Sequence, residues 1–149
     1  MDPGQILQTY LNAVGAAVMA DDWPTYSAAV SLPCLILTSD ESKVVASLDE
    51  LRAGFDLFRD TLRMQRVTDY VRLVEHAAQA GPGLISGRYV THVISGGHRV
   101  VHAFQSHMTL RQIGVHWCAV SVTNALPNSR WPLVRLALDP DISQKGPET

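Results

Sequence analysis

The chain has 149 residues, of which 46% are hydrophobic and 17% are charged, and its formal net charge is -2. These values are typical of one globular domain with a sizeable core, and they argue against a disordered chain. The sequence has no basic run and no interleaving of aromatic with basic residues, so we expect no nucleic-acid partner.

The first part of the chain predicts two helices followed by a small hairpin. Apolar side chains recur every three or four positions over residues 6–20, which indicates an amphipathic helix. A second, short helix over residues 24–30 is expected to end before Pro33, which cannot continue it. Residues 34–38 and 43–46 are short apolar runs separated by Ser, Asp and Glu, a turn composition, and we interpret them as a hairpin.

A third helix is predicted from Ser47, because Ser47 and Glu50 match a capping box at a helix N-terminus. Side chains at helical spacing follow and form an apolar stripe, made of Leu51, Phe55, Phe58 and Leu62.

Beyond residue 65 the apolar period changes to two, which is typical of strands. Strands are predicted over residues 67–73, 84–95, 99–111 and 115–125, with turns at 81–83, 96–97 and 112–114. Long strands joined by tight turns imply an antiparallel meander. The predicted fold class is therefore α+β, with three N-terminal helices packed on a curved, mostly antiparallel sheet.

We expect a single domain over residues 1–149, since the sequence has no internal repeat, linker or low-complexity tract. Its core would span about residues 5–126, and residues 127–149 would be a C-terminal extension. Within the extension, residues 128–138 predict a short helix and residues 139–149 a polar, frayed tail.

A cytoplasmic protein without a membrane partner is predicted. The longest apolar stretches, such as residues 13–20, are too short to cross a bilayer. Residues 1–4 lack the basic segment that begins a signal peptide.

The hairpin at residues 96–97 sets an expected strand register. A two-residue turn pairs Ser95 with His98, and counting back then places Thr91 opposite His102. A turn at residues 111–114 would extend this pairing to the last strand, and the first strand would place Val71 beside Thr91. The face turned toward the helices would then carry a few polar groups in an apolar wall: Asp69, Thr91, His102 and Thr123. Such a wall is the usual composition of a small-molecule pocket.

The chain resembles the nuclear-transport-factor-2-like superfamily, which includes SnoaL-like and ketosteroid-isomerase-like proteins. The resemblance covers about residues 5–126 and rests on an ordered set of segments. They are Ala-Asp-Asp-Trp at 20–23, Leu-Pro at 32–33, Ser-Leu-Asp-Glu-Leu at 47–51, Gly-Arg-Tyr at 87–89, Met-Thr-Leu-Arg at 108–111 and residues 114–117. It implies a cone-shaped α+β fold with a pocket between helices and sheet, and often a dimer through the outer sheet face.

The isomerase-like members use an acidic base with a helix-one tyrosine and a protonated sheet aspartate as an oxyanion site. Tyr10 lies on the first predicted helix, as the resemblance requires. The third long strand reads Val-His-Ala-Phe at 101–104, without a carboxylate, and Asp40 falls in a turn. This departure argues against steroid-type isomerisation.

The candidate catalytic residues are His102, Asp69 and Tyr10. His102 would be a general acid or base, or else a core histidine hydrogen-bonded to Thr91 or Thr123. Asp69 would orient His102 or act as a base, or else be a solvated strand-end residue. The candidate ligand-binding residues are Thr91, Thr123, Tyr26, Phe55, Phe58, Tyr89, Phe104 and Trp117, whose alternative role is core packing.

No metal and no cofactor are expected. Six histidines occur, and His107 and Cys118 would pair across strands, but compact ligand spacing is missing. We interpret Cys34 and Cys118 as buried free thiols.

The sequence predicts a protein that binds a small apolar molecule in this pocket and leaves enzymatic activity open. One hypothesis is an isomerase, dehydratase or cyclase that uses His102. The other is a non-catalytic dimeric binding or assembly domain whose cavity is filled by side chains. A homodimer is expected, with a contact surface on the outer sheet face that includes Arg88, Gln105, Val120 and Val122.

Overall fold

The computed structural model describes residues 1–124 and has an α+β architecture. Its helices are α1 (Pro3–Met19), α2 (Trp23–Ala28) and α3 (Leu48–Met64). Its strands are β1 (Val30–Leu37), β2 (Ser42–Val45), β3 (Asp69–Gly81), β4 (Leu84–Ser95), β5 (His98–Arg99), β6 (Phe104–Ile113) and β7 (His116–Asn124). The predicted C-terminal extension, with its short helix and polar tail, lies outside the described residues.

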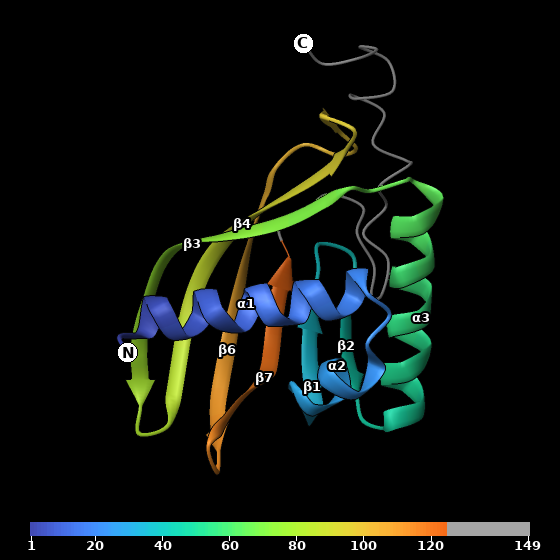
Figure 1. Ribbon diagram of the computed structural model, residues 1–149. Coiled ribbons are helices and arrows are strands. Elements are labelled where there is room, and N and C mark those ends of the chain that lie inside the picture. The colour runs from blue at the N-terminus through green and yellow to red at the C-terminus, as the bar shows by residue number, and fades with distance from the viewer. Residues whose placement is uncertain (125–149) are drawn as a thin grey trace.

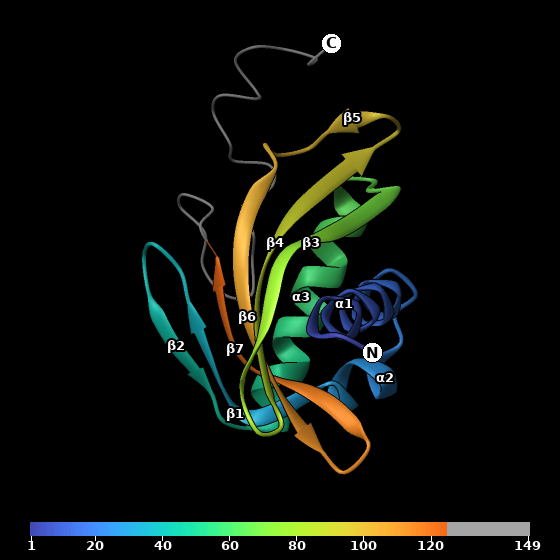
Figure 2. The same cartoon turned by 90° about the vertical axis from the view of Figure 1, so that its left-hand side faces the viewer.

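The strands form one curved, mixed sheet. Their order is β2-β1-β7-β6-β4-β3, and β5 pairs with β4. Strand β1 runs parallel to β7, whereas the other neighbours are antiparallel. The parallel pair is a feature that the predicted meander did not include. Figures 1 and 2 place α1, α2 and α3 on the same side of the sheet, so the interior lies between helices and sheet.

Helix α1 begins three residues earlier than its apolar pattern predicted. The Asp2 side chain accepts a hydrogen bond from the Gln5 backbone N–H at 2.8 Å, and the Gln5 side chain accepts one from the Asp2 backbone N–H at 3.1 Å. This reciprocal capping box satisfies two N–H groups at the helix start. Pro3 fits the first turn because its missing N–H would have no helical partner there.

Helix α3 starts at the predicted place, although only half of the predicted capping box forms. Ser47 caps the helix by accepting a hydrogen bond from the Glu50 backbone N–H at 3.1 Å. The Glu50 carboxylate instead pairs with Lys43 at 3.0 Å and accepts from the Ala46 N–H at 3.4 Å. These contacts tie the β2 end of the hairpin to the first turn of α3.

The second helix ends earlier than the predicted residue 30. Helix α2 ends at Ala28, and β1 already begins at Val30, before Pro33. Val30 pairs with Ala119 of β7, and this strand pairing explains why Val30 is not helical. Pro33 itself lies within β1.

The apolar stripe predicted for the first helix is confirmed. Leu7, Leu11, Val14 and Val18 are all buried on the face of α1 that packs on the sheet. Within residues 1–124, no helix has both the length and the apolar character that a membrane span requires.

The turn at residues 96–97 is confirmed, since Ser95 pairs with His98. The register then shifts by two residues, because residues 100–103 form no strand and β6 begins at Phe104. Thr91 therefore pairs with Phe104, and the predicted pairing with His102 is wrong. A shift of two residues keeps each side chain of β6 on its predicted face.

The predicted register of β3 is wrong by one residue. Arg72, and not Val71, pairs with Thr91. Because a one-residue shift exchanges the two faces of a strand, Arg72 is buried beneath the helices and Val71 is exposed on the outer face.

The last hairpin is tighter than predicted. Ile113 pairs with His116, so only two residues form the turn. After a bulge, Met108 pairs with Val122 and not with Trp117. Val122 packs against core residues on the helix side, so its predicted place on the outer face is wrong.

Candidate functional site

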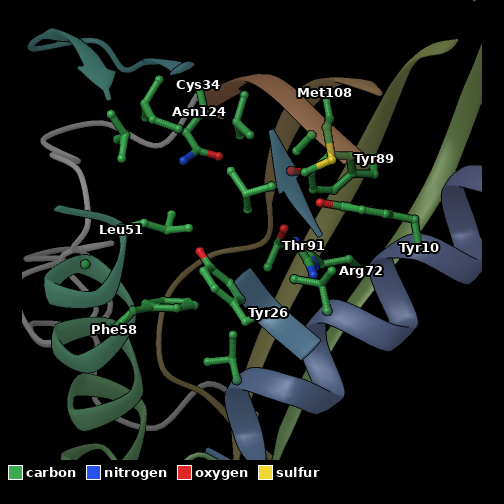
Figure 3. Close-up of a pocket in the computed structure, with 18 of the residues that line it drawn as sticks. Tyr10, Tyr26, Cys34, Leu51, Phe58, Arg72, Tyr89, Thr91, Met108 and Asn124 are labelled. Carbon is green, nitrogen blue, oxygen red and sulfur yellow. The ribbon is translucent and has the colours of Figure 1, made fainter. Parts of the chain in front are cut away.

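A cavity of about 140 Å³ lies between the helices and the sheet. Figure 3 shows it with α1 on one side and α3 on the other. Its apolar wall includes Val14 and Val18 from α1, Leu51 and Phe58 from α3, and Phe104 and Met108 from β6. Its polar lining side chains are Tyr10, Tyr26, Tyr70, Arg72, Tyr89, Thr91 and Asn124. An apolar wall with few polar groups is the usual composition of a ligand site.

An aromatic cluster holds Tyr26 at the cavity wall. The ring centroids of Tyr26 and Phe55 are 4.9 Å apart, and those of Trp23 and Phe55 are 5.4 Å apart. Trp23 also stacks on Tyr26 at 6.2 Å. Asp22 fixes the start of α2, since it accepts hydrogen bonds from the N–H and hydroxyl of Thr25 at 3.2 and 2.6 Å. The short helix thus carries a rigid tyrosine to the cavity.

Arg72 is the charged side chain among the described residues that line the cavity. It is only 9% exposed, and its Nη2 donates a hydrogen bond to the Leu11 carbonyl oxygen at 3.0 Å. Its guanidinium lies 5.0 Å from the ring centroid of Tyr70 and 5.8 Å from that of Tyr89, within cation–π range. The ion pairs found among residues 1–124 do not include Arg72.

The phenol groups of Tyr10, Tyr26 and Tyr89 stay protonated at neutral pH. Burial raises the pKa of both Tyr26 and Tyr89 to about 12, although the nearby Arg72 opposes the shift in each case. Burial also raises the pKa of Tyr10, whose hydroxyl donates a hydrogen bond to the Ala29 carbonyl oxygen. That contact occupies the single proton of Tyr10, so Tyr26 is better placed to donate to a ligand.

Cys34 lines the cavity but is poorly suited to be a nucleophile. Burial raises the pKa of its thiol to about 11, so the thiolate is scarce at neutral pH. Both cysteines are free and buried, as predicted.

Six of the predicted site residues line the cavity together: Tyr10, Tyr26, Phe58, Tyr89, Thr91 and Phe104. Phe55 lies behind the wall, against Tyr26. The other four lie elsewhere, and they are Asp69, His102, Trp117 and Thr123.

The position of each of these four side chains outside the cavity follows from its place in the fold. Asp69 is exposed at the start of β3 and accepts a hydrogen bond from the Thr68 hydroxyl at 2.9 Å. His102 is half-buried in the break between β5 and β6. Trp117 packs at the border of the core, and Thr123 is exposed. Their roles stay predictions, and the function proposed below does not use them.

Sequence reasoning missed Arg72, Tyr70 and Asn124, which line the cavity. Tyr70 and Arg72 alternate with Val71 and Leu73, so a period-two pattern was visible. Hydrophobic patterning predicts that the more apolar pair faces the interior, and in this strand the prediction is wrong.

The described residues contain no group of three or more His, Cys, Asp or Glu side chains that could hold a metal ion. The predicted partners His107 and Cys118 are not opposite each other, because Arg111 pairs with Cys118.

No protein-family model and no curated protein matches the sequence. Solved structures of similar fold do exist. An NTF-2-like protein of unknown function from Shewanella oneidensis has a TM-score of 0.65 at 9% identity, over 83% of this chain and 98% of that one. A ketosteroid isomerase-like protein from Erwinia carotovora has a TM-score of 0.59 at 16% identity, over 82% and 94%.

An NTF2-like protein of unknown function from Shewanella baltica has a TM-score of 0.54 at 17% identity, over 80% of this chain and 90% of that one. Identities this low are informative about the fold alone. The curved mixed sheet, the helices on one face and these similarities agree with the predicted resemblance, and the protein has the nuclear-transport-factor-2-like fold.

Proposed function

We propose that this protein binds a small, largely apolar molecule in the cavity between α1, α3 and the sheet. The main support for this proposal is the cavity itself, which is about 140 Å³ in volume and has a mostly apolar wall. An apolar cavity of about 150 Å³ is large enough for a benzene ring. The proposed ligand is therefore a single ring or a short alkyl chain with one or two polar atoms.

The cavity favours binding over the alternative of a domain with a filled interior. Catalysis of the isomerase, dehydratase or cyclase type would need a general base beside the ligand. Among the described residues that line the cavity there is no Asp, Glu or His. Binding without turnover is thus the function that the geometry supports best.

Filling the cavity should abolish binding. Ala119 is buried and lines the cavity, so Ala119→Leu adds three carbon atoms where the ligand would lie. We expect benzyl alcohol to bind the parent protein and to bind Ala119→Leu about tenfold more weakly or not at all. Ligand-observed NMR titration measures both affinities.

The matched control is Ala78→Leu, the same change at an exposed position of β3. It should leave the affinity for benzyl alcohol unchanged. Thermal unfolding of both variants checks that the fold survives. Equal affinity of the parent and Ala119→Leu for benzyl alcohol would contradict binding in this cavity.

We also propose a homodimer through the outer sheet face. Leu73 and Val71 of β3 are 50% and 39% exposed there. Beside them, Glu75 accepts hydrogen bonds from Arg88 at 3.1 Å and Gln105 at 2.9 Å, two residues of the predicted contact surface. Apolar side chains beside polar ones are typical of a subunit interface.

Leu73→Lys should convert the dimer to a monomer, because it places a charge in the proposed apolar contact. Sedimentation velocity measures the mass of the parent and the variant. The control is Leu57→Lys on α3, where the leucine is 49% exposed but lies away from the sheet face. A parent protein that sediments as a monomer at high concentration would refute the proposed dimer.

A further inference from the structure

We infer that the ligand carries one carboxylate, which Arg72 binds, on a body of one ring or a short alkyl chain. The inference rests on the proposed function and specifies the chemical class of the ligand. Arg72 brings a full positive charge into a mostly apolar cavity.

A buried cation normally has an anionic partner. Removing a charge from water is costly unless an opposite charge and hydrogen bonds compensate it. Arg72 is 9% exposed, and no carboxylate of the described residues forms an ion pair with it. Arginine cannot escape this cost by losing its proton, because its pKa is too high. Among the described residues, Arg72 thus keeps its charge beside the cavity without a carboxylate counter-charge.

The contacts that Arg72 does make hold it in place without neutralising it. One Nη2–H bonds the Leu11 carbonyl oxygen at 3.0 Å, and the ring faces of Tyr70 and Tyr89 flank the guanidinium. A guanidinium has five N–H donors in a planar fork that matches a carboxylate with two parallel hydrogen bonds. A carboxylate in the cavity would supply the missing negative charge.

The neighbours of Arg72 would assist such a carboxylate. Thr91 is the direct cross-strand partner of Arg72, and its hydroxyl side chain lines the cavity. Figure 3 shows Arg72 beside Thr91, and Tyr26 also lines the cavity. Because burial raises the pKa of Tyr26 to about 12, its hydroxyl is a donor at neutral pH. No described acidic side chain lines the cavity to repel an anion.

The sequence of β3 also points to a functional reason for Arg72. The strand buries Arg72 while it leaves Val71 and Leu73 substantially exposed. Local rules of burial are most often violated where function requires it. With one arginine among the described residues that line it, the cavity of about 140 Å³ fits a monocarboxylate of the size of benzoate or hexanoate.

The test compares acids with neutral molecules of the same shape. Dissociation constants are measured by NMR titration for benzoate against benzamide and for hexanoate against hexanamide, with benzyl alcohol as a neutral reference. We expect each acid to bind the parent protein about ten- to a hundredfold more tightly than its amide.

Variants then assign the preference to Arg72. Arg72→Met should remove the advantage of each acid over its amide. Arg72→Lys should keep part of it, since lysine retains the charge but loses the planar fork. The matched control is Arg88→Met, which removes an exposed arginine from the outer face of β4 and should leave the preference intact.

The outcomes separate the inference from the proposed function. If benzyl alcohol binds and the acids show no advantage over their amides, the inference is overturned and the proposed function stands. If benzyl alcohol and both pairs fail to bind, both are overturned. An acid preference that survives in Arg72→Met also overturns the assignment to Arg72. The parent comparison needs no variant, so it remains decisive even if Arg72→Met does not fold.

Discussion

Replacing Phe55 by alanine is expected to destabilise the protein by about 3–5 kcal/mol, the usual cost of truncating a buried aromatic side chain. Phe55 of α3 is 1% exposed and is among the largest fully buried side chains of the described residues. Its ring contacts both Trp23 and Tyr26, so its removal leaves a cavity beneath α2. Chemical denaturation followed by circular dichroism measures the free energy of unfolding.

The control for this prediction lies on the same helix. Leu57 is 49% exposed, and Leu57→Ala should change the free energy of unfolding by about 0.5 kcal/mol or less. Because Phe55 also supports the ring of Tyr26, Phe55→Ala should in addition weaken benzyl alcohol binding. If Phe55→Ala is no less stable than Leu57→Ala, the Phe55 side chain does not make the predicted contribution to the stability of the core.

The parts of the fold that the sequence predicted well depend on local physics. The buried face of α1 follows from helical spacing, and the start of α3 follows from the Ser47 cap. The hairpin at residues 96–97 follows from two glycines with positive φ, of 55° and 86°. Each of these features is decided by neighbours within a few residues, so each is visible in the sequence.

Strand register was predicted less well, because bulges depend on contacts between distant segments. The break at residues 100–103 shifted β6 by two residues, which preserved the faces and kept Phe104 and Tyr89 in the predicted site. The same break removed His102 from the strand. Nothing local in residues 100–103 distinguishes a break from a continuous strand.

The error in β3 had a larger consequence, because an odd shift exchanges the faces. Burial of an arginine contradicts the expectation from hydrophobic patterning, and only the pairing of Arg72 with Thr91 reveals it. Arg72, which would bind the carboxylate of the ligand, is therefore the residue that hydrophobic patterning predicts on the outer face. A buried charge that breaks the hydrophobic pattern is expected mainly at functional sites.

The second large effect is expected for Gly87→Ala, which should lower the free energy of unfolding by about 1–3 kcal/mol, as overpacking usually does. Gly87 lies in β4 directly beneath α1. A Cβ atom there would collide with Leu7 of α1 and would lie 2.9 Å from both the Ala77 Cβ and the His76 carbonyl oxygen. The backbone oxygen cannot rotate away as a flexible side chain can, so the strand or the helix has to move.

The matched control is Gly81→Ala on β3, where the nearest atom to an added Cβ is Leu84 Cδ1 at 3.8 Å, an ordinary contact. Chemical denaturation should show a clear loss of stability for Gly87→Ala and little change for Gly81→Ala. Equal stability of the two variants would mean that α1 does not need the close approach at Gly87. Since α1 contributes Tyr10, Val14 and Val18 to the cavity wall, displacing it should also weaken benzyl alcohol binding. Gly87 would then determine the shape of the ligand site, because it allows α1 to pack close to the sheet.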